Sequence, residues 1–241
     1  MQQVKKSVTA LEIPYCQSCQ GYRCTPFLYC QSEELELISN NKSCQRYAKG
    51  QVIFQKGNPA LGLYCVHSGK IKISKMGGDD KEQIVHLSKE GDILGLGPLM
   101  AQIPYPTSAI ALEDCVVCFV PRNDFLQLVH SNVQFCTALM NQLAASLFEA
   151  EERMLHLAYK PVRERLADAL LLLLRTYQHT DEHQFSIAIS REDLASLVGT
   201  AKETTIRLLS ELKDEGTITS KGSQITILRP QRLVQIAAKY D

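Results

Sequence analysis

Nine cysteines provide the most reactive side chains of this 241-residue chain, and they are unevenly distributed. Four of them lie close together near the N-terminus: Cys16, Cys19, Cys24 and Cys30. Thiolates are soft ligands that suit iron or zinc, and four of them match the ligand number of a tetrahedral zinc site. In a reducing cytoplasm such a cluster indicates metal or redox chemistry, and the odd total argues against complete pairing as disulfides.

A second candidate site lies near the C-terminus, where the sequence predicts two short helices joined at a glycine. Ser190-Arg-Glu-Asp193 has the spacing of a capping box, so we expect a helix to begin at Arg191. Gly199 interrupts that helix, and Thr200-Ala-Lys-Glu203 repeats the capping spacing to begin a second one. The stretches TITS and QITIL flank a Lys-Gly-Ser turn and form a hairpin. The order helix, helix, hairpin predicts a winged helix-turn-helix.

The second of these helices carries side chains that can read DNA. Lys202, Glu203 and Arg207 lie on roughly one face, since steps of four or five residues return to the same side of a helix. Arg207 can donate two hydrogen bonds to guanine, Glu203 can accept one from cytosine, and Lys202 can contact a phosphate or a base. The alternative is that Glu203 only completes the capping box and that Arg207 is a solvated surface charge.

The part of the chain before this site shows two different patterns in the spacing of its apolar residues. From Tyr47 to Pro121 short apolar stretches alternate with glycine turns, which predicts a small antiparallel roll or barrel. A long helical pattern follows, in which apolar residues recur four and three positions apart, as in the seam of a coiled coil. The seam residues are Met140, Leu143, Leu147, Ala150, Met154 and Leu157. We interpret this helix as the contact of a parallel dimer; the alternative is an amphipathic helix packed on its own domain.

These patterns divide the chain into four parts. Pro161 ends or kinks the long helix and marks the beginning of the C-terminal domain. We expect a cysteine-rich segment over 1–31, a roll over 32–130, a dimerisation helix over 131–160 and a winged helix-turn-helix domain over 161–241. The fold class is therefore α+β.

Composition narrows the class of protein further. Lys+Arg and Asp+Glu number 26 each, so overall charge gives no argument for nucleic acid and any DNA contact must come from a local face. No apolar run approaches the roughly 18 residues of a membrane span, and no secretory signal begins the chain. We therefore expect a soluble cytoplasmic protein without a membrane partner. An enzyme is not expected, because the chain has no nucleophile with a base, no phosphate-binding glycine loop and no H-E-x-x-H motif.

Over nearly its whole length the chain resembles the cyclic-AMP receptor/fumarate-nitrate regulator (CRP/FNR) family of transcription factors. The resemblance rests on YAKGQVIFQKGNP, LYCVHSGKIKI and EGDILGLG in the roll, on the long helix, and on VGTAKETTIRLLSELKDEG. It implies a cyclic-nucleotide-binding-like jelly roll, contact with RNA polymerase, and an inverted-repeat operator in double-stranded DNA. The family's E-T-x-x-R recognition pattern falls on Glu203, Thr204 and Arg207. Where the fumarate-nitrate type has a serine beside the arginine, this chain has Ile206, which puts the preferred half-site in question at that base pair.

The resemblance also bears on what the roll senses. Members that bind cyclic nucleotides have a glutamate in the glycine-rich turn and a later Arg-Ser pair, and those places hold Leu96 and Thr107 here. Without a fixed cation, only backbone donors and Ser108 remain for a phosphate, so a cyclic nucleotide is not expected.

The oxygen-sensing branch of the family instead has a C-x2-C-x5-C run before a Pro-Phe pair, and one distant cysteine near the end of the roll. This chain has a C-x2-C-x4-C run before Pro-Phe, and a cysteine in VVCFVP at the distant position. The resemblance implies a [4Fe–4S] or [2Fe–2S] cluster with these ligands: Cys16, Cys19, Cys24 and Cys118. Because one gap is shorter, Cys30 and Cys115 stay as spare candidates. Zinc, thiol redox chemistry and inert cysteines are the alternatives.

The leading hypothesis is a homodimeric, sequence-specific regulator that senses oxygen, redox state or nitrogen oxides through the cluster. Assembly or loss of the cluster would change how the N-terminal segment packs, and with it the spacing of the two recognition helices. One rival is a regulator of the same family that uses zinc, thiol redox or a small-molecule effector. Another is a ligand-binding module that does not bind DNA.

Overall fold

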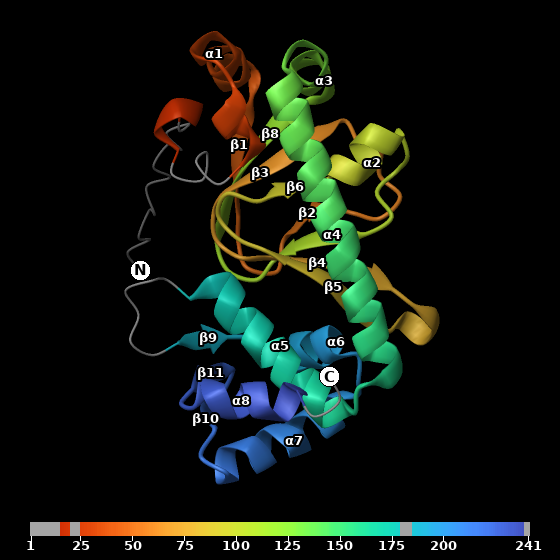
Figure 1. Cartoon of the computed structure of the whole chain (residues 1–241), viewed down its shortest axis with the longest axis vertical. Coiled ribbons are helices and arrows are strands. Elements are labelled where there is room, and N and C mark those ends of the chain that lie inside the picture. Colours follow the sequence, from red (N-terminus) through yellow and green to blue (C-terminus); the bar gives the residue numbers. More distant parts are fainter. Residues whose placement is uncertain (1–14, 20–24, 179–184, 239–241) are drawn as a thin grey trace, which may run out of the picture.

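The computed structural model describes residues 15–19, 25–178 and 185–238. Figure 1 shows a β-roll at one end of the molecule, a smaller group of helices and short strands at the other, and a long helix, α4, that runs alongside both. Cys24, one of the predicted ligands, lies outside the described residues. Within the described ranges, none of the helices combines the length and the apolar character that a membrane crossing requires.

Two four-stranded antiparallel sheets form the roll, in the orders β1-β8-β3-β6 and β2-β7-β4-β5. The strands are β1 (Ser43–Tyr47), β2 (Val52–Phe54), β3 (Gly62–Ser68), β4 (Ile71–Met76), β5 (Glu82–Ser88), β6 (Ile93–Leu94), β7 (Ser108–Ala111) and β8 (Cys115–Pro121). The first and last strands pair with each other, which closes the segment on itself. The antiparallel roll predicted from the alternation of apolar stretches and turns is confirmed.

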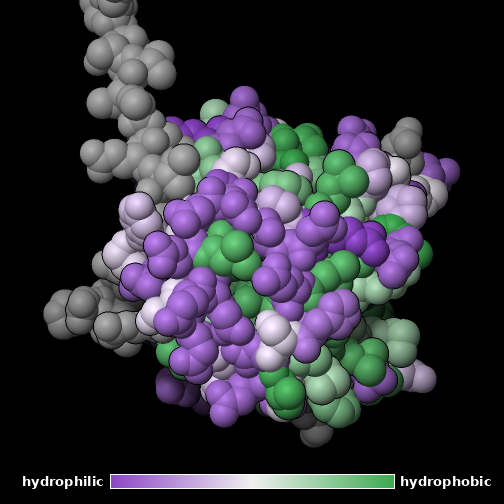
Figure 2. Space-filling model, turned by 90° about the horizontal axis from the view of Figure 1, so that it is seen from above, coloured by the Kyte–Doolittle hydropathy of each residue, from purple (hydrophilic) through white to green (hydrophobic). Residues whose placement is uncertain are grey.

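Short helices cover the ends of the roll. They are α1 (Ser32–Asn41), α2 (Leu96–Ala101) and α3 (Arg122–Ser131), with the 3₁₀ turns η1 (Cys16–Ser18), η3 (Pro26–Tyr29) and η4 (Gly78–Asp80). The core beneath them is mainly apolar, and Leu63, Ile71 and Phe125 have no exposed surface. Figure 2 looks down on this end, where hydrophilic residues cover the centre of the view and apolar residues are more frequent toward the lower right.

Helix α4 (Val133–Tyr159) begins at Asn132, whose side-chain oxygen accepts a hydrogen bond from the backbone N–H of Phe135 at 2.9 Å. Only Phe135 and Leu139, near its beginning, are buried. The predicted seam residues are all exposed in the single chain, with Leu147 at 59% and Met154 at 64%. From Met140 to Met154 the helix is therefore apolar along a face that its own chain leaves exposed, whereas Leu157 also lies against Gly199 of the same chain.

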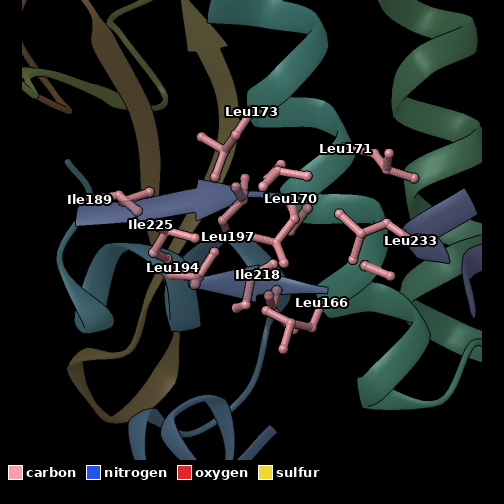
Figure 3. Packing of buried hydrophobic residues seen from close by; sticks show 14 of the residues in the cluster. Leu166, Leu170, Leu171, Leu173, Ile189, Leu194, Leu197, Ile218, Ile225 and Leu233 are labelled. Carbon is pink, nitrogen blue, oxygen red and sulfur yellow. The ribbon is translucent and has the colours of Figure 1, made fainter. Parts of the chain in front are cut away.

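The C-terminal part contains the predicted helix-turn-helix. After α5 (Val162–Tyr177) come β9 (Ser186–Ala188), α6 (Arg191–Val198), α7 (Lys202–Asp214), β10 (Ile218–Lys221), β11 (Gln224–Ile227) and α8 (Pro230–Ala237). Strands β10 and β11 form the predicted hairpin, and β9 adds a third antiparallel strand that the sequence reading did not include. In Figure 3, leucines of α5 point toward Leu194 and Leu197 of α6 and toward Ile218 and Ile225 of the hairpin. One leucine-rich core thus fixes the position of both helices of the motif.

The capping predictions had different outcomes. Ser190 caps α6 as predicted, with its hydroxyl accepting from the backbone N–H of Asp193 at 2.9 Å. The predicted capping box from Thr200 to Glu203 is wrong, because the N-cap of α7 is Ala201. The backbone N–H of Thr200 instead donates to the carbonyl of Ala195, so this residue closes the end of α6.

Candidate sensor site and nucleic-acid interface

Cysteines from separate parts of the sequence line one small cavity between the N-terminal segment and the roll. Cys16 and Cys19 come from the segment around η1, Cys65 from β3, and Cys118 from β8. Directly opposite residues of antiparallel strands point to the same side of a sheet, and Cys118 lies opposite both Cys44 of β1 and Cys65 of β3. Three cysteines therefore form a row across one face of the sheet, and the segment with Cys16 and Cys19 covers it.

Polar groups hold the N-terminal cysteines in place. The backbone N–H of Cys16 donates to the Ser39 hydroxyl at 2.9 Å, and the Lys42 ammonium donates to the Cys16 sulfur at 3.2 Å. Cys19 Sγ lies 3.3 Å from Nδ1 of His67, which is on β3 two residues after Cys65. The cavity thus offers sulfur ligands beside one cation and one imidazole.

The structure brings three of the four predicted ligands together: Cys16, Cys19 and Cys118. Cys118, however, is bonded to Cys44 as a disulfide, so it is not the free thiolate that the sequence reading assumed. A sulfur in a disulfide carries no thiolate charge, so Cys118 can act as a metal ligand only after reduction. Within residues 15–19, 25–178 and 185–238, no three His, Cys, Asp or Glu side chains are arranged to hold a metal ion.

Neither spare candidate lines the cavity, although Cys30 lies near Cys16. Burial, and to a smaller extent the charge of Glu34, raises the pKa of the Cys30 thiol to about 12, so this thiol is protonated at neutral pH. Cys115 is buried, and its sulfur donates to the carbonyls of Lys70 and Glu113. Since Cys115 is three residues before Cys118 on one strand, it faces the other side of the sheet.

Three residues at the site were not predicted to take part in it: Cys65, His67 and Cys44. The sequence contained one signal for Cys65 and His67. They are two residues apart on a predicted strand, and residues with this spacing point to the same face. Cys44 could not be placed, because its neighbour in the sheet is 74 residues away and is set by the pairing of the first and last strands.

The second candidate site is the exposed face of α7. Lys202, Glu203, Ile206 and Arg207 are exposed, whereas Thr204 is half-buried. The opposite face packs into the core through Leu208, Leu209 and Leu212, which are at most 5% exposed. Three of the four predicted DNA-contact residues thus share an accessible face, and Thr204 lies at its edge.

Acidic partners hold both basic residues of this face. Lys202 Nζ lies 2.5 Å from Glu192 of α6, and Arg207 Nη1 lies 2.5 Å from Glu211, one turn further along α7. Glu211 is also bound by Arg163 of α5 at 3.1 Å. These carboxylates were not predicted as partners, although the four-residue spacing of Arg207 and Glu211 is a recognisable signal of an ion pair on a helix.

Comparison with known proteins supports both parts of the chain. The model of the cyclic nucleotide-binding domain matches residues 44–132, and that of the Crp-like helix-turn-helix domain matches residues 164–236. The transcriptional activator protein Anr of Pseudomonas aeruginosa is 27% identical over 95% of this chain and 95% of its own. The fumarate and nitrate reduction regulatory protein of Escherichia coli is 27% identical over 92% of this chain and 90% of its own.

A solved structure agrees with these relatives. FixK2 from Bradyrhizobium japonicum superposes with a TM-score of 0.73 at 28% identity, covering 83% of this chain and 99% of that one. The roll, the helix-turn-helix and the order in which they follow each other are therefore shared with known regulators. The chain belongs to the CRP/FNR family of transcription regulators.

Proposed function

We propose that the protein is a homodimeric, sequence-specific DNA-binding regulator whose N-terminal cysteines hold an oxygen- or redox-sensitive metal group. The observation that carries the DNA-binding part is the accessible face of α7, which lies between a capped first helix and a hairpin. The names of two relatives, a fumarate and nitrate reduction regulator and an anaerobic regulatory protein from Pasteurella multocida, support the sensing part.

DNA recognition would use Lys202, Glu203, Thr204 and Arg207. Arg207 can form a bidentate contact with guanine and Glu203 can accept from a cytosine amine, while Lys202 and Thr204 fit phosphate or base contacts. Ile206, which is 43% exposed on the same face, offers an apolar surface to a thymine methyl group. The carboxylates of Glu192 and Glu211 would give up their present partners when DNA replaces them.

Substitution of Arg207 tests this assignment. Arg207→Ala is expected to lower the affinity for an inverted-repeat duplex, selected by the wild-type protein from random sequences, by roughly 1–3 kcal/mol per half-site. It should also lower discrimination at one base pair. Fluorescence anisotropy over a series of salt concentrations measures both effects.

Arg232→Ala is the matched control, because Arg232 is an exposed arginine on α8 of the same domain. Equal losses in the two variants would show a general charge effect and would contradict base reading by Arg207. Absence of salt-dependent binding by the wild-type protein would favour a ligand-binding module that does not bind DNA.

Dimerisation would use α4. Its seam residues, from Met140 to Leu157, are apolar and exposed over a helix of 27 residues. A second copy of the same helix would cover this face in the manner of a parallel coiled coil. Such a dimer places two α7 helices in successive major grooves of an inverted repeat. By family resemblance, RNA polymerase is the further partner.

With Cys118 reduced, the cysteines of the cavity would supply the sulfur donors that such a metal group needs. Cys16, Cys19 and Cys118 line the cavity, and Cys24 would supply the fourth ligand from a segment outside the described residues. When bound, an iron–sulfur cluster would supply a group that reacts with oxygen or nitric oxide. The cavity measures about 50 Å³. At roughly 10–15 Å³ of such volume for each water, the cavity has room for only a few waters, so a cluster of several iron and sulfur atoms requires the N-terminal segment to move.

The N-terminal segment contacts the proposed dimer helix, α4, directly, so a movement of the segment would affect the position of that helix. Phe27, which follows the cysteine run, packs against Phe135 of α4 with ring centroids 5.3 Å apart. The side chain of Asn132, the N-cap of α4, donates to the carbonyl of Tyr29 at 2.9 Å. A change in the packing of the cysteine segment therefore acts on the beginning of α4, which supports a shift in population between two dimer arrangements.

Metal analysis of anaerobically purified protein tests the sensing part. We expect iron and acid-labile sulfide in similar amounts after reconstitution, and their loss in Cys16→Ser and Cys19→Ser. Cys115→Ser is the matched control, since Cys115 lies on the other side of the sheet. One equivalent of zinc without sulfide would instead support the zinc alternative. Absence of any bound metal would contradict the metal group altogether.

A further inference from the structure

We propose that Cys44 and Cys118 form a reversible thiol–disulfide pair that decides whether the sensor cavity can take up its metal group. This inference rests on the proposed sulfur-ligated group, because Cys118 is the one ligand that the roll itself contributes. It adds a residue, Cys44, to which neither the family resemblance nor the proposed ligand set gives a role.

The sheet places the two sulfurs together without any rearrangement. Cys44 of β1 and Cys118 of β8 are directly opposite in the antiparallel register, and their Cα atoms are 4.0 Å apart. This separation is close to that of the narrow type of antiparallel pair, about 4.5 Å, in which opposite side chains approach most closely. The disulfide therefore joins residues that the pairing of β1 with β8 already places opposite each other.

The two cysteines differ in accessibility. β1 is an edge strand, and Cys44 on it is half-buried, whereas Cys118 in the neighbouring strand is 5% exposed. A soluble oxidant therefore reaches Cys44 first. Cys118 lies behind it and faces the cavity with Cys16 and Cys19, which are both free thiols. Cys44 is thus the outer member of the pair and Cys118 the inner one.

A low-molecular-weight disulfide such as oxidised glutathione is a sufficient oxidant. The Cys44 thiolate attacks one sulfur of oxidised glutathione, which forms a mixed disulfide and releases one glutathione thiolate. The Cys118 thiolate then attacks the Cys44 sulfur and releases the second glutathione. In total two protein thiols are oxidised, one glutathione disulfide is reduced to two thiols, and the two protons pass to the departing thiolates.

Formation of this bond removes one ligand from the cavity and leaves the others. Cys118 then has bonds to its own Cβ and to Cys44 Sγ, and it can no longer act as a thiolate ligand. Cys16 and Cys19 stay free in the same structure. The oxidised protein is therefore expected to be unable to assemble the metal group until a thiol reductant restores Cys118.

The experiment uses the full-length protein, freed of metal, in two portions. One portion is oxidised with oxidised glutathione and the other is kept reduced. Peptide mapping under non-reducing conditions identifies the linked cysteines. Each portion is then desalted and incubated anaerobically with ferrous iron and sulfide, without thiol reductant, and bound iron and sulfide are measured. Cys44→Ser is treated in the same way, with Cys115→Ser as the control that changes a cysteine of the same strand on its other face.

Five results support the proposal together. The oxidised wild type contains a Cys44–Cys118 peptide and fails to take up iron and sulfide, whereas the reduced wild type takes them up. Cys44→Ser takes them up in both portions, and Cys115→Ser behaves as the wild type. The wild-type comparison needs no substitution, so a folding defect in a variant does not remove the test.

Other results would contradict either the role of Cys44 or the proposed metal group, and the experiment distinguishes the two cases. Equal uptake by the oxidised and reduced wild type, or a peptide that links Cys118 to Cys65, overturns the role of Cys44. Failure of the reduced wild type to take up iron and sulfide overturns the proposed metal group, and the inference fails with it. The peptide map distinguishes these cases, because it reports the disulfide without any metal.

Discussion

Lys72 is a buried lysine that connects the roll to the helix-turn-helix. Its ammonium lies 2.7 Å from Glu82 of the neighbouring strand and 2.6 Å from Asp193 in the first turn of α6, and the residue is 8% exposed. Burial alone would lower the pKa of Lys72, but hydrogen bonds to Asp193 and Glu82 outweigh it, so the pKa is raised above 10.5. The charge is therefore stabilised by one carboxylate from each side of the interface.

Removal of this charge is expected to destabilise the protein strongly. Lys72→Met leaves two carboxylates close together without their cation, and breaking a buried ion pair in this way typically costs about 3–5 kcal/mol; the partial exposure of both carboxylates places the expected loss near the lower end. Urea unfolding followed by circular dichroism measures it. Lys75→Met on the same strand is the control, because Lys75 is exposed and should change stability by less than about 0.5 kcal/mol.

The difference in unfolding free energy between the wild type and Lys72→Met is expected to change with pH in one direction. Because the pKa of Lys72 is raised by folding, its contribution is fully present below the unfolded value of 10.5 and is lost as the pH rises through the folded value. The gap in stability between wild type and Lys72→Met should therefore be constant near neutral pH and shrink in alkali. If Lys72→Met lowers the free energy of unfolding at neutral pH by no more than Lys75→Met does, the ion pairs of Lys72 contribute little to stability.

At the scale of elements, Gly199 is the point at which α6, α4 and β5 meet. It ends α6 in the left-handed conformation, with φ of 72°. A Cβ at this position would lie 2.9 Å from a methyl carbon of Leu157 on α4 and 3.1 Å from the side-chain oxygen of Gln83 on β5. The turn of the helix-turn-helix therefore touches both the long helix and the roll, and only glycine fits this contact without displacement.

Gly199→Ala tests this contact, and Gly222→Ala is its matched control. Both glycines have positive φ, but a Cβ at Gly222 in the hairpin turn would meet nothing within 4 Å. Each substitution adds backbone strain of about 1–2 kcal/mol, and Gly199→Ala should lose more because Leu157 and Gln83 must also shift. Thermal or urea unfolding measures the two losses. If the two substitutions destabilise the protein equally, the close contacts of Gly199 with Leu157 and Gln83 do not contribute to the loss of stability.

The elements of this region show what local sequence can and cannot predict. Ser190 was predicted correctly as a cap because capping depends on residues three apart in the chain. The same rule failed at Thr200, since the left-handed Gly199 draws the next N–H into the end of α6. Strand β9 was missed because three residues carry little pattern, and its pairing with β11 is decided by a partner almost forty residues away.

At the scale of the whole molecule, the order of roll, long helix and helix-turn-helix was predictable, whereas the contact between roll and helix-turn-helix was not. The change of hydrophobic period from short strands to a 4-3 repeat is a local signal, and it marks where each part begins. Ile84 and Leu87 of β5, however, share one core with α5 and α6. Three residues apart, they would face opposite sides of a regular strand, and the register shift at Val85 that separates them from this pattern is not visible in local sequence, nor is the partner that covers them. The cysteine row across β1, β8 and β3 escaped prediction for the same reason.

The exposed face of α4 leads to a prediction about assembly. Leu147 lies at the middle of the seam and is 59% exposed in the single chain, so Leu147→Glu would place two carboxylates against each other in a parallel dimer. We expect this variant to be monomeric in light scattering and analytical ultracentrifugation at concentrations where the wild type is dimeric. Ala145→Glu adds the same charge on the opposite side of the helix, and the dimer should persist.

DNA binding distinguishes loss of the dimer from loss of the fold. A monomer retains one intact α7, so Leu147→Glu should still bind nonspecific duplex with a reduced salt dependence, because it neutralises about half as many phosphates. Its preference for an inverted repeat over a single half-site should disappear, since that preference requires two recognition helices about one DNA turn apart. If Leu147→Glu stays dimeric, or if Ala145→Glu dissociates as readily, the seam is not the contact and α4 packs against some other surface.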